Sequence, residues 1–270
     1  MSNDLGSTDL QPRSEQDGEI VADTIAPVDV WETYLDTLGA VVDEARIHFN
    51  DEGVSSTVVD PANVAMSDLS LSAAHFESYD AGAVTVGVNL SRFADAIGLG
   101  KAGDLARVRV DMESRKLWVD IGDRYHQRIA LIDPDSIRKE PDIPDGLELP
   151  NAPVVEAGEF ADALDAVELV TDHVKLGWDG ERELFVVQGL GDVDETHVEF
   201  GMADLIGGEF HEATASLFSH DYLDEIFGVI PSDAEVEIEF GEDHPAKFHY
   251  SALEGHLNVT AMCAPRIKSE

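Results

Sequence analysis

The chain has 270 residues, of which 43% are hydrophobic, so it can bury the cores of two globular domains and is not a wholly disordered protein. Its 56 acidic and 17 basic residues give a formal net charge of −39. Self-repulsion of this size destabilises a compact fold at low ionic strength, whereas molar salt shortens the screening length to about 3 Å. We therefore favour a protein of a high-salt cytoplasm. A nucleic-acid mimic that captures basic partners is the alternative.

Cysteine content and hydropathy limit the compartment and the chemistry. Cys263 is the single cysteine, which excludes an internal disulfide and a multi-cysteine metal site. The polar N-terminus lacks the basic and apolar regions of a secretory signal, and no apolar run is long enough to cross a bilayer. We expect a cytoplasmic, prokaryotic protein without a metal or another cofactor.

Short strands and a few short helices follow one another along the chain. Residues 1–18 are polar and predicted to be disordered. Alternation and β-branched content predict strands at 54–59, 105–110, 116–121, 235–240 and 257–260. Helical spacing of apolar residues predicts four helices, which contain Trp31, Leu35, Leu38 and Val42; Leu90, Phe93 and Ile97; Phe160, Leu164 and Val167; and Tyr222, Ile226 and Ile230. Asn89 and Ser219 are the predicted N-caps of the second and fourth helices.

An internal repeat organises these elements. A helix, a turn, an alternating strand and a second strand occur over 89–119 and again, in the same order, over 219–250. The earlier helices match too, each followed by two strands joined through an acidic turn with glycine. We predict an α+β protein with two structurally similar domains built on antiparallel sheets.

Four prolines fall between the two copies, within residues 131–150, and favour an extended connector. The predicted organisation is a disordered extension (1–18), an N-terminal domain (19–130), a connector (131–150), a C-terminal domain (151–266) and a tail (267–270).

Several segments of the sequence are similar to those of one protein family. Residues 59–66 (VDPANVAM), 131–144 (LIDPDSIRKEPDIP) and 264–267 (APRI) match best, and 87–92 and 231–236 support them. On these segments the chain resembles proliferating cell nuclear antigen, the DNA polymerase sliding clamp, in its haloarchaeal forms.

The resemblance implies the DNA clamp fold, with antiparallel sheets outside and four short helices lining the inner face of a trimeric ring. Such a homotrimer encircles duplex DNA and acts as a processivity factor. It tethers DNA polymerase and other proteins that carry a clamp-binding peptide, and a clamp loader places it on DNA. The alternative is a clamp-like paralogue, a regulatory protein-binding module that does not load on DNA.

The resemblance also assigns roles to residues by position. The edge strands that join subunits would be Arg124–Ala130 and Glu195–Phe200, with Arg124, Tyr125, His126, Gln127 and Arg128 on one and His197, Val198, Glu199 and Phe200 on the other. The pocket for the partner peptide would be formed by Val59, Met66, Ile143, Pro245, Met262, Ala264 and Pro265. Core packing is the alternative for Val59 and Met66.

The charge of the predicted helices departs from the family pattern, because basic residues there would contact DNA phosphates. The segments 28–44 and 158–172 contain acidic residues and no Lys or Arg. Direct phosphate contacts would therefore be few, and hydrated cations would have to lie between protein and DNA. The candidate DNA-facing residues are Arg92, Lys101, Arg107 and Arg109.

We find no pattern typical of an enzyme. A phosphate-binding loop, a dinucleotide-binding glycine fingerprint and a His-Glu-x-x-His pair are all absent from the sequence. Asp133 and Asp135 lie in the proline-rich connector and fit a solvated turn better than a metal site. We therefore predict no catalytic residues.

Overall fold

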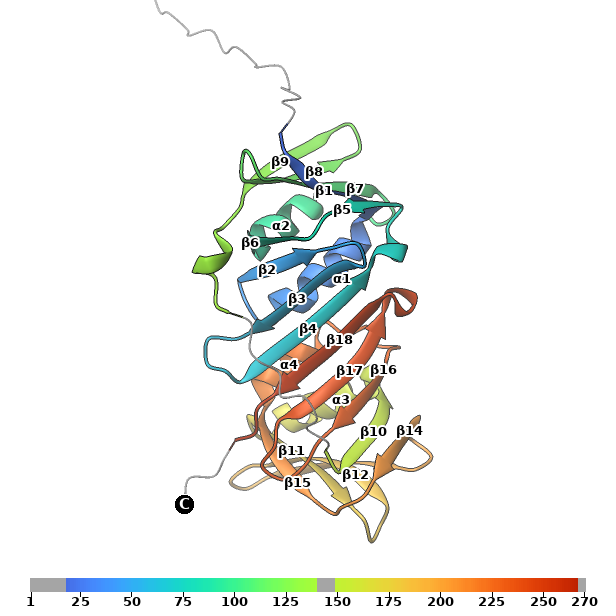
Figure 1. Ribbon diagram of the computed structural model, residues 1–270. Coiled ribbons are helices and arrows are strands. Elements are labelled where there is room, and N and C mark those ends of the chain that lie inside the picture. Colours follow the sequence, from blue (N-terminus) through green and yellow to red (C-terminus); the bar gives the residue numbers. More distant parts are fainter. Residues whose placement is uncertain (1–17, 140–148, 267–270) are drawn as a thin grey trace, which may run out of the picture.

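The computed structural model describes residues 18–139 and 149–266, and its two halves run through the same order of elements (Figure 1). Predictions for residues 1–17, for 140–148 with Ile143, and for 267–270 lie outside the described residues. The first half contains β1 (Ile20–Pro27), α1 (Val28–Gly39), β2 (Glu44–Phe49), β3 (Gly53–Val59), β4 (Ala65–Ser72), β5 (Ser78–Ala81), β6 (Val84–Asn89), α2 (Leu90–Ile97), β7 (Leu105–Asp111), β8 (Lys116–Ile121) and β9 (Tyr125–Ala130). The second contains β10 (Asn151–Glu156), α3 (Ala157–Glu168), β11 (His173–Asp179), β12 (Leu184–Leu190), β13 (Glu195–Gly201), β14 (Gly207–Phe210), β15 (Ala215–Ser219), α4 (His220–Phe227), β16 (Glu235–Glu239), β17 (Ala246–Ala252) and β18 (Leu257–Cys263).

Three antiparallel sheets form from these strands. Their orders are β5-β1-β7-β8-β9, β14-β10-β16-β17-β18-β4-β3-β2-β6 and β13-β12-β11-β15. The nine-stranded sheet runs through both halves of the chain, because β18 pairs with β4 from Leu257↔Leu71 to Cys263↔Ala65. This continuous ladder makes the joint between the halves a part of the sheet.

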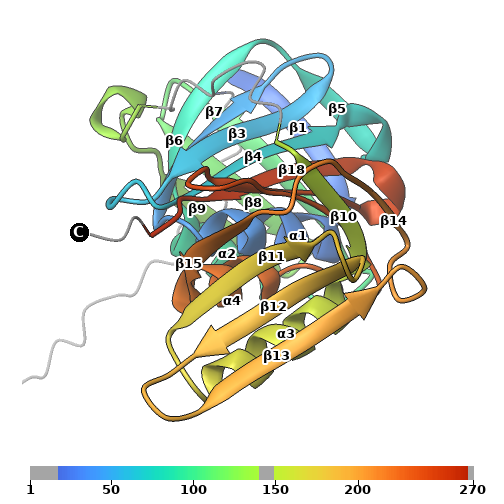
Figure 2. The same ribbon diagram turned by 90° about the horizontal axis from the view of Figure 1, so that it is seen from below.

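The helices lie between sheets, and side chains along the strands alternate between the face that packs on the helices and the face that points away from them. α1 packs against α2 in the first half, and α3 packs against α4 in the second (Figures 1 and 2). On β7, Ala106, Val108 and Val110 are buried in the core with the helices, while Arg107 points to the other face. Alternation of this kind marks a sheet with one buried face and one solvated face.

Some predicted helix ends differ from the structure. Val42 follows α1, which ends at Gly39, and Ile230 follows α4, which ends at Phe227. Asn89 does cap α2, since its Oδ1 accepts a hydrogen bond from Arg92 N at 3.0 Å, whereas the Ser219 side chain makes no cap hydrogen bond to α4. Ser219 thus has the predicted N-cap position, without the hydrogen bond that a serine can make there. Within the described residues, none of the helices has the length and apolar character needed to cross a membrane.

Candidate functional site

Three apolar side chains lie in a row across neighbouring strands at one end of the nine-stranded sheet. Val59 of β3 pairs with Met66 of β4, and Met66 pairs with Met262 of β18. Their strand neighbours Val58, Ala65 and Cys263 are buried on the opposite side. The row thus lies on the sheet face that points away from the helices, yet Met66 and Met262 are only 8% and 9% exposed. An apolar row at the joint of two domains is suited to bind an apolar anchor.

The start of the connector lies against the edge of the same sheet. Ile132 N donates a hydrogen bond of 2.8 Å to Gly87 O on the edge strand β6. A Cβ atom at Gly87 would come within 2.7 Å of both Ile132 O and Ile137 Cδ1, so this close approach requires glycine. The Arg46 guanidinium holds the next turn, since its Nη2 donates to Ile137 O at 3.0 Å. The connector is therefore fixed to the first domain as far as Ile137.

The segment after β18 forms the other side of the site. Ala264 N donates to Val64 O at 2.7 Å, and Arg266 N donates to Leu217 O at 2.7 Å. Pro245 precedes β17, whose first residue, Ala246, pairs with Cys263. The structure thus places together six residues of the predicted pocket, namely Val59, Met66, Pro245, Met262, Ala264 and Pro265.

The two strands predicted to join subunits are both edge strands. β9 ends the five-stranded sheet, and β13 ends the four-stranded sheet. The inner face of each strand packs into the core of its own subunit, through Ile129 on β9 and Phe200 on β13. An edge strand has unpaired backbone groups along one side and can add a strand from another chain.

Comparisons with known proteins agree with this geometry. A sequence profile described as "Proliferating cell nuclear antigen, N-terminal domain" matches residues 26–136. The "DNA polymerase sliding clamp" of Haloarcula marismortui is 46% identical over 249 residues, which cover 91% of this chain and 98% of the relative. The sliding clamp of Natronomonas pharaonis is 44% identical, with the same coverage. The chain belongs to the proliferating cell nuclear antigen family of sliding clamps.

A solved clamp structure supports the fold independently. The structure titled "C-terminal region of FEN-1 bound to A. fulgidus PCNA" superposes with a TM-score of 0.85 at 36% identity. The match covers 92% of this chain and all of that one. The predicted two-domain clamp fold is therefore confirmed.

The four residues predicted to face DNA do not share one surface. Arg92 is exposed on α2, and Lys101 is exposed in the loop that follows it. Because residues 106, 108 and 110 enter the core, Arg107 and Arg109 of β7 point away from the helices. Arg107 pairs with Asp23 of β1, with its Nε 2.8 Å from Oδ1. Our placement of all four on one DNA-facing surface thus disagrees with the structure. Only Arg92 and Lys101 remain candidates for residues that face DNA.

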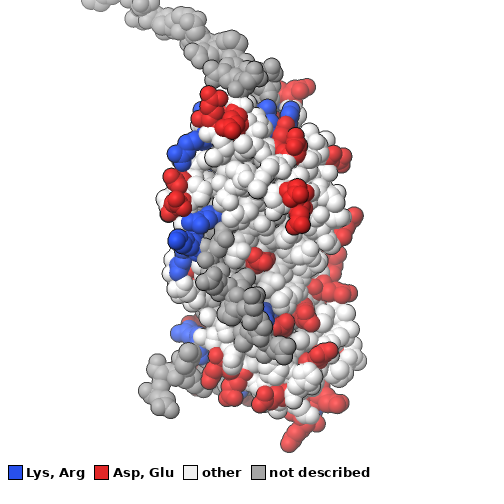
Figure 3. Space-filling view, in the orientation of Figure 1, with Lys and Arg blue, Asp and Glu red and all other residues white. Residues whose placement is uncertain are grey.

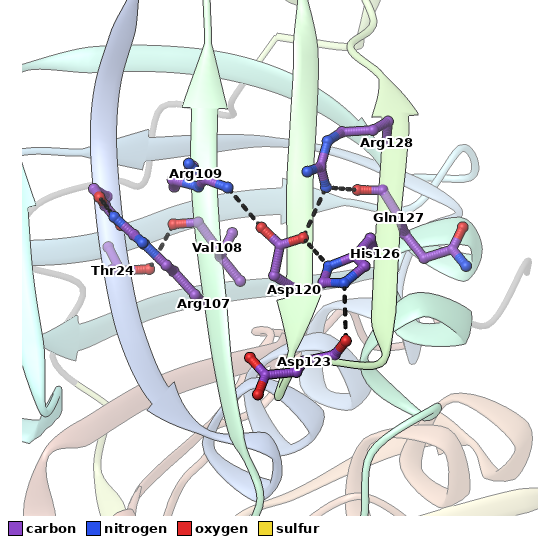
Figure 4. A network of polar contacts seen from close by, with 10 residues as sticks. Thr24, Arg107, Val108, Arg109, Asp120, Asp123, His126, Gln127 and Arg128 are labelled. Atoms are coloured by element: carbon purple, nitrogen blue, oxygen red, sulfur yellow. Dashed lines mark hydrogen bonds and ion pairs between the residues drawn. The ribbon is translucent and has the colours of Figure 1, made fainter. Parts of the chain in front are cut away.

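A polar network lies on that outer face beside the edge strand β9 (Figure 4). The Asp120 carboxylate accepts hydrogen bonds from Arg109 Nη2 at 2.6 Å and from Arg128 Nη1 at 3.0 Å, and His126 Nδ1 lies 2.8 Å from it. The two guanidinium groups also lie over the Trp118 ring, at 4.8 Å and 4.2 Å from its centroid. Burial raises the pKa of Asp120, but the hydrogen bonds from Arg109, His126 and Arg128 outweigh it and lower the pKa to about 2. The network ties β9 to β8 and β7.

The sequence did not reveal Asp120, although an acidic residue inside the apolar strand KLWVDI was a signal. We expect Asp120→Asn to lower the free energy of unfolding at pH 7 by on the order of 2 kcal/mol, because two partly buried guanidinium groups lose their counter-charge. The pKa of Asp120 is lower in the folded state, so this stabilisation is present above the ordinary value of 3.8 and is lost as the pH falls towards about 2. Denaturant titrations at constant salt should show the difference between wild type and variant shrinking across that range. Asp123→Asn, which changes an exposed carboxylate in the next turn, is the matched control and should change little.

The solvent-facing sides of the helices are acidic. The exposed acidic residues are Asp29, Glu32 and Asp36 on α1; Asp95 on α2; Glu159, Asp162, Asp165 and Glu168 on α3; and Asp221, Asp224 and Glu225 on α4. Burial, together with the charges of Asp221, Asp224 and Asp60, raises the pKa of Glu225. Such faces repel phosphate groups unless cations screen them.

Basic side chains gather elsewhere. On the face shown in Figure 3 they lie mainly along the left margin, the side on which β6 and the start of the connector lie in Figure 1, whereas acidic side chains dominate the right margin and the lower end. Arg46 and Arg138 belong to this region and both hold backbone carbonyls. In the ranges 18–139 and 149–266, no group of three or more His, Cys, Asp or Glu side chains could hold a metal ion.

Proposed function

We propose that the chain is the subunit of a homotrimeric ring that encircles duplex DNA and tethers DNA polymerase and other proteins carrying a clamp-binding peptide. The observation that carries this is the convergence of the apolar row, the connector and the C-terminal segment at one end of the sheet that joins the two domains. The FEN-1 segment bound to the related archaeal clamp indicates the kind of partner. The function we propose is to raise the local concentration of enzymes at DNA, with no catalytic step of the clamp itself. Ile143 stays a predicted member of the pocket.

Assembly of the ring would join β9 of one subunit to β13 of the next. The faces of the two strands are compatible in character. The outer face of β9 contains His126 and Arg128, and the outer face of β13 contains Glu195 and Glu199. The inner faces are largely apolar on both strands. They hold Tyr125, Gln127 and Ile129 on β9 and Thr196, Val198 and Phe200 on β13. Antiparallel pairing would align apolar with apolar and basic with acidic side chains, which stabilises cross-strand pairs.

The closed ring would hold the protein on DNA by its topology more than by its affinity for DNA phosphates. Arg92 and Lys101 are the basic residues that we place on the helix side, where acidic side chains otherwise dominate. We propose that the protein works in a high-salt cytoplasm, where cations screen these helices. The same acidic faces favour the second candidate, a clamp-like paralogue that binds proteins and does not load on DNA.

Primed circular DNA distinguishes these two candidates. With the cognate DNA polymerase and clamp loader in molar KCl, we expect the protein to lengthen the products of single binding events severalfold. Omission of the loader is the control, because a closed ring cannot reach circular DNA unaided. A trimer that gives no stimulation in the presence of an active loader would contradict the replication role and favour the paralogue.

A further inference from the structure

One buried carboxylate lies in the turn between β3 and β4, next in sequence to Val59 of the apolar row. Asp60 is 5% exposed, and its Oδ1 accepts hydrogen bonds from Val64 N at 2.6 Å and Ala65 N at 2.8 Å. Its Oδ2 accepts a third from Ala62 N at 2.8 Å. These contacts fix the turn that links Val59 to Met66. Burial raises the pKa of Asp60, but the backbone N–H groups outweigh burial and lower it, so the group is ionised at neutral pH.

The first of these contacts continues into the C-terminal segment. Asp60 holds the amide of Val64, and the carbonyl of Val64 accepts the hydrogen bond from Ala264 N at 2.7 Å. Ala264 and Pro265 belong to the predicted pocket for a partner peptide. Asp60 therefore holds the C-terminal side of the site through one intervening residue.

Two further contacts reach the connector and the second domain. Arg138 Nη1 donates to the backbone carbonyl of Asp60 at 2.9 Å, and the Arg138 guanidinium also hydrogen-bonds to Asn63. Tyr222 of α4 donates its hydroxyl to Asp60 Oδ2 at 3.3 Å, across 162 positions of sequence. Asp60 thus contacts the connector and a helix of the other domain directly, and it reaches the C-terminal segment through Val64.

We propose that Asp60 is a positioning residue, which holds the connector and the C-terminal segment at the spacing that a partner peptide requires. This inference rests on the proposed function, because it assumes that the peptide binds over Val59, Met66 and Met262. Asp60 itself does not touch the peptide. It acts through Val64 on one side of the site and through its own carbonyl and Arg138 on the other.

The test is a binding titration in molar KCl with a synthetic peptide of the A. fulgidus FEN-1 C-terminal region. We expect Asp60→Ala to weaken binding about tenfold and Asp60→Asn, which keeps one acceptor oxygen, about threefold. Asp111→Ala is the matched control. Asp111 is 1% exposed and accepts hydrogen bonds from Glu113 N and Ser114 N in the distant β7–β8 turn. Its loss should lower stability and leave peptide affinity within about twofold.

Amide hydrogen exchange separates positioning from general destabilisation. In Asp60→Ala we expect faster exchange at Ala264 N, which bonds to Val64, with unchanged exchange in the β11–β12 ladder. If the Ala variant does not fold, Tyr222→Phe and Asp60→Asn carry the same test. Wild-type protein that fails to bind the peptide would overturn the proposed function. Wild-type binding that Asp60→Ala and Asp60→Asn leave unchanged would overturn the positioning role alone.

Discussion

Val198→Asp should convert the proposed trimer into monomers at micromolar concentration. Val198 lies half-buried in the middle of the edge strand β13, on the face that would meet Tyr125 and Ile129 of the next subunit. A carboxylate there would be buried without a partner, and the cost of burying it exceeds what one short strand pair contributes. Light scattering in molar KCl should give three times 29.3 kDa for the wild type and 29.3 kDa for the variant.

Val186→Asp is the matched control for this prediction. Val186 is also half-buried and lies one strand further in, on β12, on the outer face of the same sheet. We expect Val186→Asp to remain trimeric and to differ only in stability. A trimeric Val198→Asp protein would contradict the β9–β13 interface, and it would leave the family assignment untouched. Loss of the ring should also abolish stimulation of the polymerase on circular DNA.

The sequence predicted the architecture well because repetition and alternation are local signals. The acidic turns at 51–53 and 179–181 do join β2 to β3 and β11 to β12. Both predicted interface segments became edge strands. The helix ends were less predictable, because Val42 and Ile230 continue the apolar spacing after the helix has ended. The spacing of apolar residues reports which side chains pack in the core and not where the helical hydrogen bonds stop.

The sequence predicted those residues of the site whose own side chains would contact a peptide, and it missed those that act by holding other residues in place. Val59, Met66 and Met262 converge as expected, because their register follows from strand alternation. Arg107 and Arg109 were misplaced because their charge shows that their face of β7 is solvated but not whether that face lies on the helix side of the molecule. Asp60 and Asp120 were missed because both act through partners on other elements, Tyr222 of α4 for Asp60 and Arg128 of the neighbouring strand β9 for Asp120. Contacts of that kind depend on the fold itself.

Val59→Asp should abolish binding of a partner peptide and leave the proposed trimer intact. Val59 is the half-buried end of the apolar row, beside Met66, on the sheet face away from the core. An aliphatic or aromatic anchor placed there would have to desolvate the new carboxylate, so we expect affinity to fall by at least about a hundredfold. Titration of the FEN-1 C-terminal peptide in molar KCl measures this loss.

Ser55→Asp is the control, because Ser55 lies on the same strand and the same face, four residues from Val59 and away from the apolar row. It adds the same charge to an already acidic protein, so any difference between the two variants reports position and not net charge. Peptide binding should survive Ser55→Asp, and both variants should elute as trimers. Equal loss of binding in both would mean that charge repulsion, not occupation of the apolar row, governs affinity. Unchanged binding in Val59→Asp would place the peptide elsewhere on the clamp, because no anchor could then lie on Val59.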